Sequence, residues 1–260
     1  MKLKLKDKIF FEKNGYVIIR SLFNHKECSE LYDSLLQFAG DSFEPLLNVH
    51  REDFVFAQCS QKINKFFNTI DKVNFLKKLK KCTDIAKKYF IHPKLKRVLN
   101  FIYKKKIVGL QTQIIFKKPK TSYSKISHNP HQDNSYGMSP NGLFFSTHIF
   151  LKDVSKTNGT IYVYPKTHKF GLFKFQNVNS YQSKKLKHAN KVKTKNFEDN
   201  KIDIIAKKGD FLIMHGNLIH GSYPNLSKKN SRPIFCGCYI VKGEKYRKGY
   251  TADRRELDFD

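Results

Sequence analysis

The sequence predicts an α+β fold in which N-terminal helices buttress a core of short β-strands. Up to about residue 90, apolar residues recur at near-helical spacing among many lysines. From residue 107 the chain changes to short runs rich in β-branched and aromatic residues, separated by turn signals such as Asn158-Gly159. Many short strands with such turns are typical of a sandwich or a barrel rather than of a parallel sheet.

The N-terminal part contains start and stop signals for helices. Residues 9–20 predict a short helix followed by a strand. We expect Asn24 to cap a second helix, because it is a favoured capping residue and Glu27 stands at the capping-box position. Gly40 is the expected end of that helix, since glycine often follows the last helical turn.

The remaining elements follow from the hydrophobic pattern. Residues 61–90 carry an apolar stripe, which predicts one or two surface helices that end at Pro93. Residues 176–201 are polar and too long for an ordinary connection, so we expect a lid or a mobile insertion there, within a single domain that spans residues 1–260. The predicted strands are 107–116, 144–151, 160–164, 202–205, 211–214 and 233–241.

The composition excludes several classes of protein. Apolar residues make up 40% of the 260 residues, which is enough for a sizeable core and argues against a disordered chain. No run of about 18 or more apolar residues exists, so we expect no membrane span. The basic N-terminus lacks the apolar segment of a signal peptide. Together with the odd number of cysteines, this predicts free thiols in the cytoplasm.

The formal net charge of +28 has two interpretations. A strongly basic chain can bind nucleic acid, but only seven of its 50 basic residues are arginine, the residue best suited to phosphates and bases. The lysine excess could instead reflect the composition of an AT-rich genome. We therefore do not expect a nucleic-acid partner, although the charge would help to steer a small anionic substrate.

His131-Gln132-Asp133 is the first candidate for a metal site. In a strand, residues two apart face the same side, so His131 and Asp133 could bind one ion. An imidazole and a carboxylate with open positions opposite suit iron(II). The same His-x-Asp pattern also occurs by chance in surface turns, so it needs support from elsewhere in the chain.

That support comes from the C-terminal third. A facial triad needs another histidine from a distant strand, and both His215 and His220 follow the predicted strand 211–214. Arg232 opens the next predicted strand. An arginine binds a carboxylate through two parallel hydrogen bonds, which lysine cannot do, so Arg232 is a candidate for binding a carboxylate cosubstrate.

The order of these motifs resembles that of the phytanoyl-CoA dioxygenase family of iron(II)- and 2-oxoglutarate-dependent oxygenases. The resemblance spans most of the chain. Each short motif is weak alone, but their joint order is specific. The motifs that carry it are Phe11-Glu12-Lys13-Asn14-Gly15-Tyr16, Gln111-Thr112-Gln113, Lys118-Pro119, Pro130-His131-Gln132-Asp133, Leu151-Lys152-Asp153-Val154, Asn158-Gly159, Pro165-Lys166-Thr167-His168, Gly209-Asp210, His220-Gly221-Ser222 and Arg232.

The resemblance implies a double-stranded β-helix, that is, a jelly-roll or cupin-like core with the metal at its mouth. It chooses His220 over His215, so the implied iron ligands are His131, Asp133 and His220. It places Arg232 and Ser222 on the cosubstrate 2-oxoglutarate, and leaves Gln111 and His148 as candidate contacts to it. His148 stands where the family often has an aromatic residue, and it could equally face the core.

The implied reaction uses oxygen and 2-oxoglutarate to hydroxylate a small organic substrate, with release of succinate and carbon dioxide. The net charge favours an anionic substrate. Related halogenases lack the carboxylate, so Asp133 argues against halogenation. Two alternatives remain open. One is an AlkB-like oxidative nucleic-acid demethylase, although the second downstream arginine of that class is missing after Arg232. The other is a metal-free binding protein on the same fold.

Overall fold

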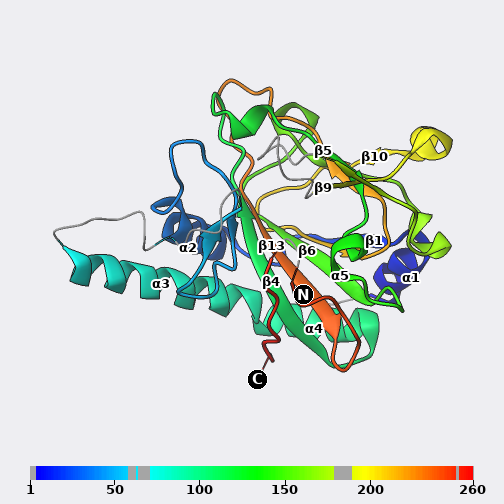
Figure 1. Cartoon of the computed structure of the whole chain (residues 1–260), viewed down its shortest axis with the longest axis horizontal. Helices are drawn as coiled ribbons and strands as arrows, with labels where there is room; N and C mark the ends of the chain where they lie inside the picture. The colour runs from blue at the N-terminus through cyan, green and yellow to red at the C-terminus, as the bar shows by residue number, and fades with distance from the viewer. Residues whose placement is uncertain (1–3, 58–62, 64–70, 179–188, 250–251, 260) are drawn as a thin grey trace.

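The computed structural model describes residues 4–57, 63, 71–178, 189–249 and 252–259. Two antiparallel sheets form its centre, and helices cover the outer face of the larger one (Figure 1). The helices are α1 (Leu5–Asn14), α2 (His25–Leu36), α3 (Lys72–Phe90), α4 (Pro93–Tyr103) and the short α5 (Asn134–Gly137).

The large sheet has the strand order β1-β11-β6-β13-β4-β2-β3. Neighbours in space are distant in sequence, as expected for a jelly roll rather than for a series of hairpins. Its strands are β1 (Tyr16–Ile19), β2 (Leu46–Leu47), β3 (Val55–Phe56), β4 (Ile107–Ile115), β6 (Phe144–Phe150), β11 (Phe211–His215) and β13 (Ile234–Val241).

The small sheet has the order β10-β7-β12-β5 and lies over the inner face of the large one. Its strands are β5 (His128–His131), β7 (Ile161–Val163), β10 (Ile202–Asp203) and β12 (His220–Ser222). One buried cluster joins the sheets, because Ile161 and Val163 pack with Leu212, Met214 and Ile234. The double-stranded β-helix expected from the resemblance is therefore confirmed, in an α+β protein.

The outer face of the large sheet carries the main core. Phe211, Phe235 and Tyr239 point toward α2, α3 and α4, whose apolar residues complete the same cluster. Burying this aromatic surface contributes roughly 1.5–3 kcal/mol for each fully buried large side chain. The N-terminal helices thus buttress the sheet, as the sequence predicts.

The inner face of the large sheet has a polar band between two apolar zones. Directly opposite residues on neighbouring strands share a face. Cys236 of β13 pairs with Gln113 and His148, and Cys238 pairs with Gln111 and Ser146. The resulting polar row consists of Gln111, Gln113, Cys236, Cys238, Ser146 and His148. Buried polar groups in such numbers indicate a binding site rather than a core.

Most predicted elements are present, with differences at their ends. The predicted helix–strand unit is α1 and β1, and Asn24 caps α2 with Glu27 as its capping-box partner. One prediction is wrong, and one helix was not predicted. The helix α2 ends at Leu36 without using Gly40. Pro93 does not only follow α3: it begins α4, because proline fits the first helical turn, where its missing N–H is not needed.

Residues 176–201 are described in part. Strands β8 (Gln176–Val178) and β9 (Ala189–Lys191) pair with each other, and a 3-10 helix, η5 (Lys195–Asn200), follows. The strand β9 lies beside β5, where the Val192 amide donates to the Pro130 carbonyl at 2.8 Å. Residues 179–188, within the predicted lid, lie outside the described residues, so the lid stays a prediction.

Candidate active site

Two histidines meet where β5 and β12 pair. The antiparallel register places His131 directly opposite His220, and their ring centroids lie 4.4 Å apart. Each strand is short and held on the inner sheet by apolar neighbours such as Val163. The sequence therefore brings together two residues that are 89 positions apart, because strand pairing fixes their register.

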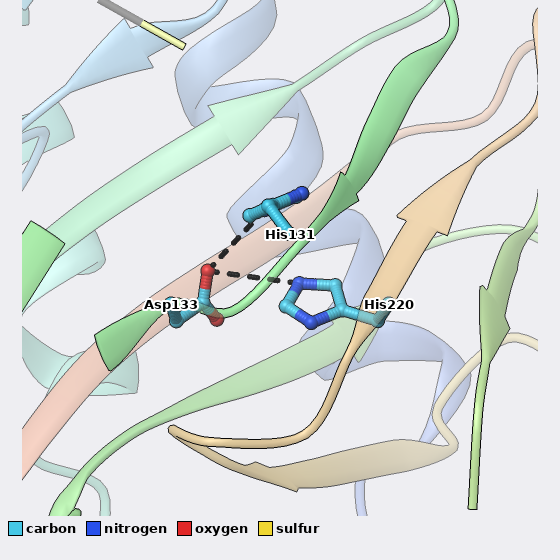
Figure 2. Close-up of side chains that lie close together, drawn as sticks. All are labelled: His131, Asp133 and His220. Carbon is cyan, nitrogen blue, oxygen red and sulfur yellow. Dashed lines mark ion pairs between the residues drawn. The ribbon is translucent and has the colours of Figure 1, made fainter. Parts of the chain in front are cut away.

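Asp133 joins the two histidines from a turn. Its Oδ1 atom lies 3.5 Å from His131 Nε2 and 3.6 Å from His220 Nε2 (Figure 2). The prediction that His131 and Asp133 share one strand is wrong. The strand β5 ends at His131, and Asp133 has the right-handed helical backbone (φ −61°, ψ −33°) that begins α5. The turn, not the strand alternation, brings the carboxylate back to the imidazole.

The buried amide of Gln132 fixes this turn. Its Nε2 donates to the carbonyls of Gly171 (2.8 Å) and Asn217 (2.6 Å), and its Oε1 accepts from the Phe173 amide at 2.7 Å. Two residues after Gln132, Asn134 forms hydrogen bonds through both its main chain and its side chain. A fully satisfied buried network of this kind is rigid, so it holds the side chains on either side of Gln132 in place.

The hydrogen bonds of the histidines determine which nitrogen faces Asp133. The Nδ1 atoms of His131 and His220 lie 2.7 Å from the Asn129 carbonyl and 3.1 Å from the Leu218 carbonyl, respectively. A carbonyl only accepts, so each Nδ1 carries the proton. In the neutral ring each Nε2 then presents a lone pair toward Asp133, which is the orientation that metal-binding histidines have.

The site is electrostatically prepared for a cation. Burial raises the pKa of Asp133, but the adjacent His220 and His131 outweigh it and hold that pKa well below its usual range. Burial lowers the pKa of His220 to about 4, so this ring is neutral at pH 7. Burial also lowers the pKa of His131, but the Asp133 carboxylate raises it by more. A carboxylate between two imidazoles within 4.8 Å of one another fits an iron(II) ion.

A second cluster lies beyond Ser222 at the start of β13. Arg232 is 1% exposed, yet its Nε and Nη2 atoms have no hydrogen-bond partner. Lys117 is fully buried beside it, and its Nζ donates to Ser222 Oγ at 3.0 Å and to the Tyr223 carbonyl. Burial is the main cause that lowers the pKa of both side chains, that of Arg232 to about 10.

These two cations lack a counterion in the described part of the chain. Neither Arg232 nor Lys117 forms an ion pair with a described carboxylate. An unpaired buried charge is unfavourable by several kcal/mol, so folded proteins rarely keep one without a ligand. The cluster therefore fits a carboxylate that comes from a bound molecule.

The polar row faces the same space. His148 is 8% exposed, its Nδ1 has no hydrogen-bond partner, and burial lowers its pKa to about 3. Gln111 likewise has a buried Oε1 without a partner. The pKa values of His148, Cys236 and Cys238 all depend in part on the charge of Asp133, which places the row near that carboxylate.

The comparison with protein families decides the identity. The sequence profile of the phytanoyl-CoA dioxygenase (PhyH) family matches residues 11–234, which is most of the chain. The chain belongs to the phytanoyl-CoA dioxygenase family. It is therefore an oxygenase of the kind that depends on iron and 2-oxoglutarate.

Curated relatives in this family are distant but match over most of their length. Phytanoyl-CoA dioxygenase 1 of Oryza sativa is 25% identical over 269 residues, which cover 95% of this chain and 92% of the relative. The peroxisomal phytanoyl-CoA dioxygenase of Homo sapiens is 24% identical over 240 residues, which cover 90% of this chain and 68% of the relative.

Solved structures show the same fold at lower identity. EctD from S. alaskensis, in its apo form, is 13% identical with a TM-score of 0.66, over 97% of this chain and 82% of that one. The epimerase SnoN, crystallised with Fe3+, α-ketoglutarate and nogalamycin RO, is 14% identical with a TM-score of 0.65, over 93% of this chain and 85% of that one. At these identities the likeness establishes the fold alone.

In this family member, one residue near the site escaped the sequence analysis. Lys117 follows β4 directly, but one lysine does not stand out among 43. Its left-handed backbone (φ 37°), unusual for lysine, is visible only in the structure. His128 is a different case, because the sequence favours an exposed loop histidine there. That prediction is wrong, since His128 lies on β5, three residues before His131, and its Nε2 lies 2.9 Å from the Tyr123 hydroxyl.

The other histidine considered as the third metal ligand, His215, lies outside this cluster. His215 ends β11 and contacts His168, with ring centroids 5.1 Å apart, instead of joining the cluster around Asp133.

Among the described residues, no helix of this phytanoyl-CoA dioxygenase homologue is long and apolar enough to cross a membrane.

Proposed function

We propose that this chain hydroxylates a small organic molecule, with His131, Asp133 and His220 as iron(II) ligands and Arg232, Lys117 and Ser222 holding the distal carboxylate of 2-oxoglutarate. The observation that carries the proposal is the convergence of two Nε2 lone pairs and one carboxylate beside buried cations without a counterion. This donor set matches the two-histidine, one-carboxylate triad of iron(II) oxygenases.

The residues would divide the work as follows. The triad would hold the metal from one side, which leaves the positions toward the large sheet open. Arg232 and Lys117 would compensate the distal carboxylate, and Ser222 would add a hydroxyl donor. The bound iron with 2-oxoglutarate and oxygen supplies the oxidising chemistry, in which 2-oxoglutarate becomes succinate and carbon dioxide.

The polar row would receive the substrate and the cosubstrate. Gln111 and His148 would contact 2-oxoglutarate through their unpartnered atoms. Their backbone lies in strands paired on both sides, so these side chains have little freedom to move. Such preorganised groups position reactants without a further entropic cost at the moment of reaction. The domain would be a single unit over residues 1–260.

A matched pair of histidine variants tests the metal assignment. His220→Ala should lose iron binding and succinate release, whereas His215→Ala should keep both, because His215 lies outside the cluster. Iron binding is measured by anaerobic equilibrium titration, and succinate by a turnover assay without substrate. His131→Ala and Asp133→Ala should behave like His220→Ala. Normal iron affinity in all three would show that the metal is bound elsewhere.

Hydroxylation itself needs a separate readout. Once a substrate from a screen of small acids stimulates 2-oxoglutarate turnover, the product made under ¹⁸O₂ is analysed by mass spectrometry. Hydroxylation predicts incorporation of one oxygen atom from O₂ into the product. A product without the label, formed with full succinate release, would mean a different oxidative outcome at the same site.

A further inference from the structure

A second buried arginine, Arg254, lies in the C-terminal tail. Its side chain is 3% exposed, although arginine is almost never fully buried without a charged partner. The carboxylate of the neighbouring Asp253 does not form an ion pair with it. Asp253 pairs instead with Arg255 at 2.7 Å and with Arg51 at 3.4 Å. In the described part of the chain, Arg254 therefore has no counterion.

The tail around Arg254 is held on both sides. The Asn48 side chain donates to the Asp253 carbonyl at 3.0 Å, and the Arg255 amide donates to the Leu110 carbonyl at 3.3 Å. Two residues further on, Leu257 bridges to Gly109 of β4. The backbone on either side of Arg254 is thus held by contacts of its neighbours with β4 and with Asn48.

The guanidinium itself is only partly satisfied. Its Nη1 donates to the carbonyls of Arg247, Gly249 and Ala252 at 3.1–3.4 Å, and its central carbon lies 5.6 Å from the centre of the Phe144 ring. Its Nε has no hydrogen-bond partner among the described residues. Carbonyl groups accept hydrogen bonds from the guanidinium, and an aromatic face attracts it, but neither neutralises a full positive charge.

The contact of Arg254 with the Phe144 ring locates it at one end of the polar row. Phe144 pairs with Ile240 of β13, two residues beyond Cys238, whereas Arg232 precedes the other end of β13. The two buried arginines therefore lie toward opposite ends of the polar row. The helix α5, which begins at Asp133, lies on the Arg254 side, because the Arg247 amide donates to the Gly137 carbonyl at 2.6 Å. Burial lowers the pKa of Arg254, and Asp133 is among the charges that act on it.

We propose that Arg254 binds an oxyanion of the primary substrate, a carboxylate or a phosphate, on the side of the iron away from the 2-oxoglutarate carboxylate. The inference rests on the proposed function, since it places the substrate relative to the same metal. A substrate with an anionic end would supply the missing counterion and the acceptor for Nε. A neutral substrate of equal shape would leave the guanidinium buried and unpaired, and so would bind less well.

The test uses three probes of equal chain length: hexanoate, hexyl phosphate and hexan-1-ol. Each is titrated calorimetrically into the iron- and 2-oxoglutarate-loaded protein under anaerobic conditions. One anionic probe or both should bind the wild type at least roughly tenfold more tightly than the alcohol, because one lost partner of a buried charge typically costs about 1.4 kcal/mol or more. The tighter anion then identifies carboxylate or phosphate.

Arg254→Gln should abolish this preference while the affinity for 2-oxoglutarate stays unchanged. Arg255→Gln is the matched control, because it removes one exposed charge from the same tail and should keep the preference. If Arg254→Gln fails to fold, Arg254→Lys retains a cation and should keep a reduced preference. Equal binding of all three probes by the wild type, or a preference that survives Arg254→Gln, overturns the proposal. Failure of the wild type to bind 2-oxoglutarate overturns the proposed function instead.

Discussion

At the scale of single residues, two buried basic side chains beside Ser222 have no carboxylate partner among the described residues. Arg232 and Lys117 lie side by side in a dry environment, and Ser222 accepts a hydrogen bond from Lys117. Such an arrangement stores unfavourable electrostatic energy until an anion binds. Under the proposed function, the carboxylate of 2-oxoglutarate would relieve this unfavourable energy and so gain affinity.

This account predicts the effect of two substitutions on cosubstrate binding. Arg232→Lys loses the bidentate fork, and Lys117→Met loses the second charge, so each should raise the dissociation constant of 2-oxoglutarate at least roughly tenfold. The measurement is an anaerobic titration of the iron-loaded protein, in which iron affinity should hardly change. Lys118→Met is the control, because Lys118 is exposed and packs over Phe43. An unchanged constant in both variants would mean that the carboxylate binds elsewhere.

Residue chemistry was predictable where the residue type is rare. Arg232 stood out because the chain has seven arginines, and it is buried next to Lys117, while its carboxylate-binding role stays a prediction. Lys117 could not stand out among so many lysines. Arg254 escaped as well, because its burial depends on the tail lying along β4, a contact between residues far apart in sequence.

At the scale of elements, capping decides where α2 begins. The Asn24 side chain accepts from the Glu27 amide at 2.8 Å, and the Glu27 carboxylate accepts from the Asn24 amide at 2.7 Å and from Lys94 of α4. The same carboxylate therefore fixes both the first turn of α2 and its contact with α4. This junction supports the outer face of the large sheet.

The pH dependence of stability should report this junction. Burial raises the pKa of Glu27, but its bonds to Lys94 and to the Asn24 amide lower it by more, so the folded pKa lies below 4.5. A carboxyl group whose pKa is lower in the folded state stabilises the fold at pH values above its unfolded pKa. This stabilisation is lost as the pH falls through the folded pKa. Glu27→Gln should therefore cost about 1 kcal/mol at pH 7, a difference that shrinks below roughly pH 4.

Denaturant titrations at several pH values measure this difference. Asp33→Asn is the control, because Asp33 is an exposed acid on the same helix. A loss of stability for Glu27→Gln that persists undiminished at low pH would show that packing, rather than the carboxylate, holds the junction.

The elements themselves show which signals in a sequence are reliable. The predicted strands match β4, β6, β7, β10, β11 and β13, because apolar runs and turn residues are local properties. The end of α3 before Pro93 was predicted, but the start of α4 at Pro93 was not, since proline can both stop one helix and start another. The position of Asp133 was wrong for a different reason: the turn depends on Gln132 bonding to Gly171 and Asn217, which no local pattern reveals.

At the scale of the whole molecule, the net charge of +28 surrounds a site that would bind anions. The summed field of such a charge accelerates the approach of an anionic ligand, and salt screens it over about 10 Å at 0.1 M. If the charge is functional, the association rate of 2-oxoglutarate should fall by roughly tenfold or more between 0.02 and 0.5 M NaCl. If it reflects composition alone, the rate should change by no more than about twofold.

Stopped-flow mixing of 2-oxoglutarate with the anaerobic, iron-loaded protein gives this rate. Nitric oxide is the control ligand, because it binds iron without carrying charge and its rate should not depend on salt. A salt dependence shared by both ligands would point to a change in the protein rather than to electrostatic steering.

The division of the site between the two sheets has a consequence for how such an enzyme can diversify. The proposed iron ligands come from β5, β12 and the start of α5, whereas Gln111, Ser146 and Cys238 come from the large sheet. Cys238 is neither a proposed metal ligand nor a proposed contact to 2-oxoglutarate, so a substitution there can change the side chains that face the site and leave both sets of residues in place. Selection or directed mutagenesis can therefore vary such a position of the large sheet for new substrates while the proposed metal ligands are kept.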